Sequence, residues 1–119
     1  MTQEYVTVTQ VMAWPAEQDG QPGYNVKAPS GTIAWQAKET FESAHVAMGH
    51  TGHLAQYQRR VVAEKALNDD RVTKLTAFLA TDAFKALRNQ EKATMEIQLG
   101  AMSLYSNVLA ERIDDFATS

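Results

Sequence analysis

Residues 95–116 carry apolar side chains on two opposite faces of one predicted helix. The first stripe, apolar except for one serine, consists of Met95, Leu99, Met102, Ser106, Leu109, Ile113 and Phe116. The second stripe consists of Ile97, Ala101, Leu104 and Val108. At about 100° per residue, the two stripes lie on roughly opposite sides of the helix. One chain of 119 residues can cover one of these faces, so the second face predicts self-association.

The first third of the chain has the pattern of short β-strands. Residues 4–14 alternate β-branched or aromatic residues with polar ones, and residues 23–29 and 32–36 form two further short runs of this kind. Asp19-Gly20 and Ser30-Gly31 are typical of tight turns between such strands. We therefore expect an antiparallel sheet of about three strands, followed by a short helix over residues 38–45.

The rest of the chain predicts an antiparallel helical hairpin. A linker over residues 46–51 precedes a long helix that begins at Gly52 or His53 and ends near Ala80. Thr81 or Asp82 can cap a turn or short helix over residues 82–87, and Asn89 can cap the last helix, which ends near Phe116. The predicted fold class is α+β and oligomeric. Its two modules, residues 1–51 and 52–119, are expected to form one compact unit.

Composition narrows the possible partners. Hydrophobic residues make up 45% of the chain and charged residues 21%, as in ordinary globular proteins. No apolar run is long enough to span a bilayer, and no secretory signal is recognisable, so we expect a cytoplasmic protein without a membrane partner. A net charge of −3 argues against nonspecific binding of DNA or RNA, but it allows a local basic pocket for one small anion.

Metal and catalytic sites are poorly supported. The chain has no cysteine, and its three histidines, His45, His50 and His53, lie around the glycine-containing linker, where a regular ligand geometry with Glu42 is not expected. The sequence contains no nucleophile elbow, phosphate-binding glycine loop or HExxH motif. We therefore expect no metal, no cofactor and no enzymatic activity.

Polar residues interrupt the apolar line of the first long helix. They are Arg60, Glu64, Asn68 and Arg71, spaced by three and four residues. One interpretation is a solvated helix flank with ion pairs such as Arg60 with Glu64. The other is a cleft lined by guanidinium groups, to which Arg112 of the last helix contributes, because the arginine fork matches phosphate oxygens.

Aromatic and amide side chains near the predicted bend could complete a nucleotide pocket. Phe78 is expected in the core, whereas Phe84 could stack on a base and Asn89 could bond its edge. The candidate ligand-binding residues are therefore Arg60, Arg71, Phe84, Asn89 and Arg112.

Three stretches resemble phage proteins. TIAWQAKETFESAH, residues 32–45, resembles a module of small tailed-phage proteins. YQRRVVAEKALNDDRVTKLTAFL from Tyr57, and IQLGAMSLYSNVLAERI, residues 97–113, resemble the two helices of a hairpin family found in crAss-like phages and prophages.

A small antiparallel sheet followed by two long helices is similar to the phage Thoeris anti-defence protein 1 family. This resemblance implies an oligomeric sponge, a dimer or a hexamer, that sequesters cyclic ADP-ribose isomers made by bacterial TIR-domain immune enzymes without cleaving them. Some members also bind cyclic oligonucleotides at a separate site. The resemblance places the signal pocket between paired protomers and implies ligand roles for Arg60, Arg112, Phe84 and Asn89.

Two other hypotheses remain open. The protein could bind and inhibit a host protein through its helical face, as its low basicity and wide apolar surface allow. It could also be a structural or accessory phage protein without a ligand.

Overall fold

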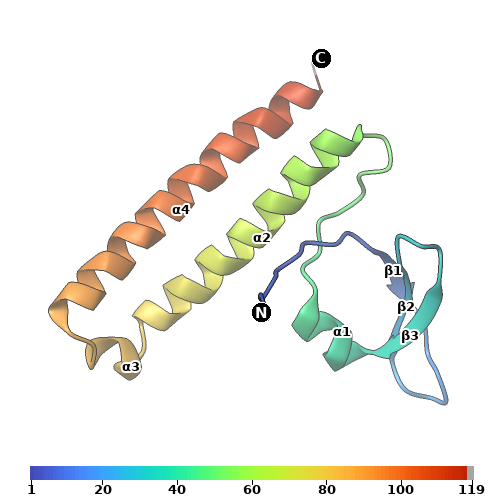
Figure 1. Cartoon of the computed structure of the whole chain (residues 1–119), viewed down its shortest axis with the longest axis horizontal. Helices are drawn as coiled ribbons and strands as arrows, with labels where there is room; N and C mark the ends of the chain where they lie inside the picture. The colour runs from blue at the N-terminus through green and yellow to red at the C-terminus, as the bar shows by residue number, and fades with distance from the viewer. Residues whose placement is uncertain (118–119) are drawn as a thin grey trace. The chain divides into compact units, whose positions relative to one another are not determined.

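The computed structural model describes residues 1–117, which form the predicted α+β fold: a three-stranded sheet, a short helix and a long helical hairpin (Figure 1). Its elements are β1 (Met12–Pro15), β2 (Gly23–Lys27), β3 (Ile33–Ala37), α1 (Lys38–Ala44), α2 (Gln56–Leu79), α3 (Asp82–Lys85) and α4 (Asn89–Phe116). They divide into two compact units, one up to His45 and the other from Val46 onward. The packing of the two modules into one body stays a prediction.

The sheet is an antiparallel meander with β2 between β1 and β3. Asp19 and Gly20 have positive φ angles of 51° and 78° in the connection between β1 and β2, as a hairpin turn requires. Gly31, with φ of 93°, closes the predicted turn between β2 and β3, and its N–H donates to the Ala28 carbonyl at 2.9 Å. Both predicted turns are therefore confirmed.

The first predicted strand is mostly wrong, since β1 begins at Met12 and residues 4–11 join no ladder in the described part of the chain. Met12 pairs with Lys27, the last residue of β2. The chain then turns back, so β2 provides no residues opposite the segment before Met12. The β-type pattern is present there, but a strand also needs a neighbour for its backbone N–H and C=O groups.

Helix α1 is attached to the sheet by an aromatic cluster. The ring of Phe41 lies 4.5 Å from that of Tyr24 in β2 and stacks on His45 at 4.1 Å, measured between centroids. The Tyr24 hydroxyl donates to Glu42 Oε2 at 2.6 Å, and this hydrogen bond is the main cause of a raised pKa of Tyr24. His45 and Glu42 therefore have structural contacts within this unit.

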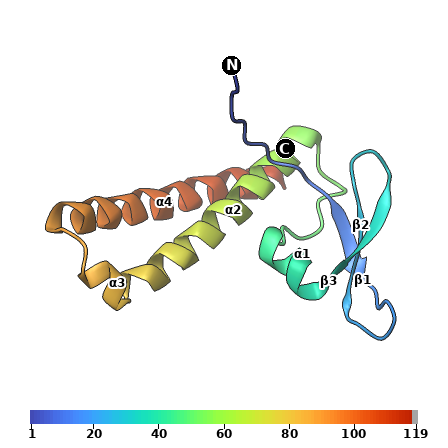
Figure 2. The ribbon, with the colours of Figure 1, turned by 60° about the horizontal axis from the view of Figure 1, so that its bottom comes forward.

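The hairpin consists of α2 and α4, which lie side by side and run antiparallel in both views (Figures 1 and 2). Helix α2 begins at Gln56, later than predicted, because residues 51–54 form a turn and Ala55 is extended. Gln58 Oε1 accepts the Ala55 N–H at 3.0 Å. As predicted, Thr81 caps α3, since its hydroxyl accepts the N–H of Phe84 at 3.2 Å.

The two stripes of α4 have different surroundings. Every member of the first stripe is buried or half-buried, and Leu109 is 0% exposed, so this face packs on α2 as predicted. The second stripe is open: Ile97 is 74%, Leu104 65% and Val108 44% exposed. Tyr105, beside that stripe, is 41% exposed. The hairpin thus leaves one apolar face of α4 without cover.

Candidate ligand-binding site

Two members of the polar line on α2 hold the hairpin together. Asn68 is buried, and its Nδ2 donates to the Met102 carbonyl of α4 at 2.8 Å. Glu64 Oε1 accepts the hydroxyl of Tyr105 at 2.5 Å, so the ion pair allowed by the spacing of Arg60 and Glu64 does not form. These contacts explain why polar residues occupy an otherwise apolar line.

Arg60 and Arg112 lie at the same level of the hairpin. The rings of Tyr57 and Phe116 meet edge-on with centroids 6.3 Å apart, and Glu64 contacts Tyr105 about two to three turns farther along the hairpin. Arg60 and Arg112 fall between these two contacts on their helices. Both are exposed, and neither forms an ion pair or hydrogen bond within residues 1–117. Two guanidinium groups at one end of the hairpin are therefore available to an anion.

The electrostatics of Tyr105 show that the charge of Arg112 reaches this part of the hairpin. The hydrogen bond to Glu64 is the main cause of a raised pKa of Tyr105, and desolvation and the Glu64 charge act in the same direction. The positive charge of Arg112 lowers the pKa of Tyr105 and partly opposes them. Tyr105, Glu64 and Arg112 thus form one electrostatically connected group.

Arg71 lies apart from this pair. It is exposed on α2, eleven residues after Arg60, which corresponds to about 17 Å along the helix. It also forms no ion pair within the described residues. The structure therefore leaves Arg71 accessible but does not group it with the other two arginines.

Phe84 and Asn89 occupy the opposite end of the hairpin. Phe84 in α3 is 8% exposed, and its ring meets that of Phe78 edge-on at 6.2 Å. Asn89 is exposed but does not cap α4, because Arg88 holds the N-cap position and its Nε binds Glu91 at 2.7 Å. Asn89 is about 35 Å from Arg112 along α4. Of the five candidate residues, only Arg60 and Arg112 therefore lie at the same level of the hairpin within one chain.

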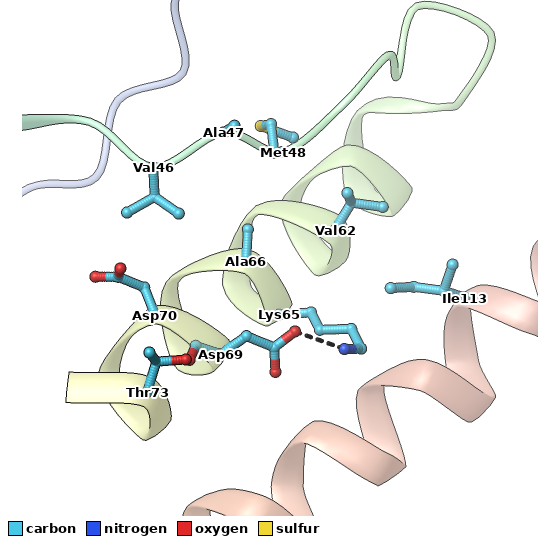
Figure 3. A pocket seen from close by; sticks show the side chains of 10 residues that line it. All are labelled: Val46, Ala47, Met48, Val62, Lys65, Ala66, Asp69, Asp70, Thr73 and Ile113. Carbon is cyan, nitrogen blue, oxygen red and sulfur yellow. Dashed lines mark hydrogen bonds and ion pairs between the residues drawn. The ribbon is translucent and has the colours of Figure 1, made fainter. Parts of the chain in front are cut away.

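A surface groove of about 510 Å³, which was not predicted from the sequence, runs along α2. The segment Val46–Met48 passes over one side, Val62 and Ala66 of α2 form the floor, and Ile113 of α4 lies at the far side (Figure 3). Asp69 and Asp70 also line it. Nothing in the aperiodic residues 46–48 indicated that they would lie along α2.

The groove is acidic and therefore a poor site for a phosphate. Lys65 Nζ lies 2.6 Å from Asp69 Oδ2, and the Ser106 hydroxyl donates to the other oxygen of Asp69. The hydrogen bond from Lys65 is the main cause of a lowered pKa of Asp69, with that from Ser106 second. The Asp70 carboxylate is paired with Lys74 at 2.8 Å. Each carboxylate is thus already paired with a lysine, and Lys65, the cation that lines the groove, is engaged by Asp69, unlike the two open arginines.

Two absences among residues 1–117 bear on the class of site. No group of three or more histidine, cysteine or acidic side chains is placed to hold a metal ion. None of the helices among these residues has the length and apolar character needed to cross a bilayer.

Comparison with known proteins identifies the hairpin. No curated protein and no solved structure matches the chain significantly. A family model, described as Sequestin, matches residues 55–115, which run from the N-cap of α2 to the last turn of α4. The name indicates sequestration of a signalling molecule, in agreement with the resemblance of the sheet and two long helices to the phage anti-Thoeris sponges. Because the match spans just over half of the 119 residues, the chain belongs to the Sequestin family.

Proposed function

We propose that this protein binds and sequesters a cyclic ADP-ribose-type messenger made by bacterial TIR-domain immune enzymes, without cleaving it. The observation that carries the proposal is the pair Arg60 and Arg112, exposed and without an ion pair in residues 1–117, on a Sequestin-family hairpin. A cyclic ADP-ribose contains two linked phosphates, and each guanidinium fork can bind phosphate oxygens with two parallel hydrogen bonds.

A complete pocket needs a second copy of the chain in this proposal. Antiparallel pairing of two α4 helices through Ile97, Ala101, Leu104 and Val108 would place the twofold axis between residues 102 and 103. Arg112 would then lie opposite position 93 of the second copy, about 6 Å along the helix from Asn89 of that copy. Pairing through the exposed stripe would thus join the arginine end of one hairpin to the bend of the other.

In such a pocket, Phe84 would stack on the adenine of the ligand. Its ring is covered in the structure, where it packs on Phe78. Stacking on an adenine therefore requires the bend to open and expose this ring when ligand binds. Arg71, about 17 Å from Arg60, would meet a different ligand group or a second ligand such as a cyclic oligonucleotide.

Thermal unfolding with cyclic ADP-ribose isomers tests the proposal. A ligand that binds the folded state raises the melting temperature, by mass action. We expect this rise with the intact protein, loss of it in Arg60→Ala and Arg112→Ala, and recovery of unchanged ligand after heat denaturation. Lys27→Ala removes an exposed charge from β2 and serves as the control that keeps the rise.

Two results would contradict the sponge proposal. If no isomer raises the melting temperature at a large excess, the protein does not bind this class of messenger. If a hydrolysed product is recovered, the protein is an enzyme that cleaves the ligand. If Arg60→Ala or Arg112→Ala also dissociates the oligomer on size exclusion, the arginines have a structural role instead.

The exposed stripe of α4 also favours a second candidate, a protein that binds and inhibits a host protein through this face. Such a protein would show no shift with nucleotides and would capture one dominant host partner. Leu104→Glu would abolish that capture while leaving the hairpin folded, because Leu104 is 65% exposed.

A further inference from the structure

The segment before β1 has strand-forming residues but no strand partner. Tyr5 is 90%, Val6 95% and Val8 67% exposed. Tyr5 and Val6 would lie on opposite faces of a strand, so neither face of this segment is covered. Residues 2–11 contain no glycine or proline and a single charge, Glu4. These are properties of a strand that lacks its neighbour.

The sequence of this segment is nearly symmetric about Thr7. Val6 and Val8 flank it, Tyr5 and Thr9 come next, and Glu4 and its near-isostere Gln10 follow. In an antiparallel pair of identical strands, each residue lies opposite its mirror position about the centre. A segment with this symmetry can therefore pair with itself in one register.

We propose that residues 4–10 pair antiparallel with the same segment of a second copy, with Thr7 on the twofold axis. Val6 of each chain then faces Val8 of the other, and Tyr5 faces Thr9, which are favourable cross-strand pairs of β-branched and aromatic side chains. Glu4 faces Gln10, whose amide can donate to the carboxylate. The pairing continues directly from β1, which is an edge strand of its sheet.

Charge and pattern argue against two other pairings of two copies. A parallel in-register pair would put Glu4 directly opposite Glu4, and like charges in that position are destabilising. A one-residue slip of the antiparallel register would place Val6 opposite Thr7 and Glu4 opposite Thr9. The register centred on Thr7 keeps valine on valine and separates the two carboxylates.

Cysteine cross-linking tests this register sharply, because the chain contains no cysteine of its own. Directly opposite residues of an antiparallel pair have Cα atoms about 4.5–5.5 Å apart, within the range that a disulfide spans. Thr7→Cys should therefore form a disulfide with its symmetry mate under mild oxidation. Thr9→Cys should not, since two Thr9 residues would lie about 13 Å apart in this register.

A mixture of two variants adds a positive control. Tyr5→Cys and Thr9→Cys, oxidised together, should form the mixed dimer in preference to either homodimer. Thr7→Pro removes a backbone hydrogen-bond donor and should abolish dimerisation through this segment. Light scattering measures the loss in a Leu104→Glu background, which removes pairing through the exposed stripe of α4. The helical circular dichroism signal of the same variant should be unchanged, because the segment lies outside the helices.

Several outcomes would overturn the proposal. Equal cross-linking of Thr7→Cys and Thr9→Cys would indicate random collision, and none in either variant would exclude the pair. Association of more than two chains through this segment would indicate stacked β-aggregates instead of a dimer. Nucleotide binding does not enter this test, so its failure would leave the sponge proposal untouched.

Discussion

At the scale of single residues, the hairpin uses polar groups for contacts that sequence alone could not assign. The spacing of Glu64, Asn68 and Arg71 shows that they lie near one helix face. It does not show that Asn68 reaches the Met102 carbonyl or that Glu64 takes the Tyr105 hydroxyl. Those partners depend on the register of α4 against α2. A polar residue on an apolar line therefore predicts either a site or a cross-helix contact, and here two of them are contacts.

Asp69 gives a prediction for pH dependence. Its pKa is lowered in the folded state, so its contribution to stability is present above the ordinary carboxyl pKa and is lost as pH falls through the folded value. Asp69→Asn should lower the free energy of unfolding at pH 7 by about 0.5 kcal/mol, because the pair with Lys65 is partly exposed. Urea unfolding between pH 7 and pH 2 measures the difference.

The control for this effect is Asp82→Asn. Asp82 is fully exposed and lies 3.8 Å from Lys85, so its replacement should change the acid limb of the stability curve little. If the stabilities of wild type and Asp69→Asn stay equally far apart at the lowest pH, the loss does not come from the carboxylate charge.

At the scale of elements, α4 was predicted well because helix periodicity is a local property. The first stripe identified its packed face, and the antiparallel connection placed Arg60 and Arg112 at one level. The strand predicted over residues 4–14 is wrong before Met12, because an alternating pattern is local whereas strand pairing depends on a neighbour elsewhere in the chain. The groove beside Val46–Met48 was missed for a related reason, since irregular backbone carries no period.

The two faces of α4 should respond oppositely to the same change. Leu109→Ala should destabilise the hairpin by about 2–5 kcal/mol, because it empties a fully buried position. Leu104→Ala, on the open stripe, should leave the unfolding free energy of dilute protein nearly unchanged and weaken self-association. Urea unfolding and sedimentation velocity separate these effects. A large loss of stability for Leu104→Ala in dilute protein would mean that the open face packs within the chain.

At the scale of the whole molecule, the described residues bury few large side chains. In the hairpin unit, the buried residues among those described are Val61, Ala63, Asn68, Phe84 and Leu109. A small core supplies little hydrophobic stabilisation, and covering the exposed stripe with a second copy would add to it.

If two copies pair through the exposed stripe, as proposed, the small core would make the binding capacity of this protein depend on how much of it is made. Folding and pairing would then be linked, so that dilute chains would be less stable and abundant chains would stabilise each other by mass action. A sequestering protein acts one molecule for one molecule. With the pocket shared by two chains, the amount of messenger that the protein can bind would therefore at first rise more steeply than its own concentration. Below a threshold concentration of the protein, most of the messenger would stay free to signal.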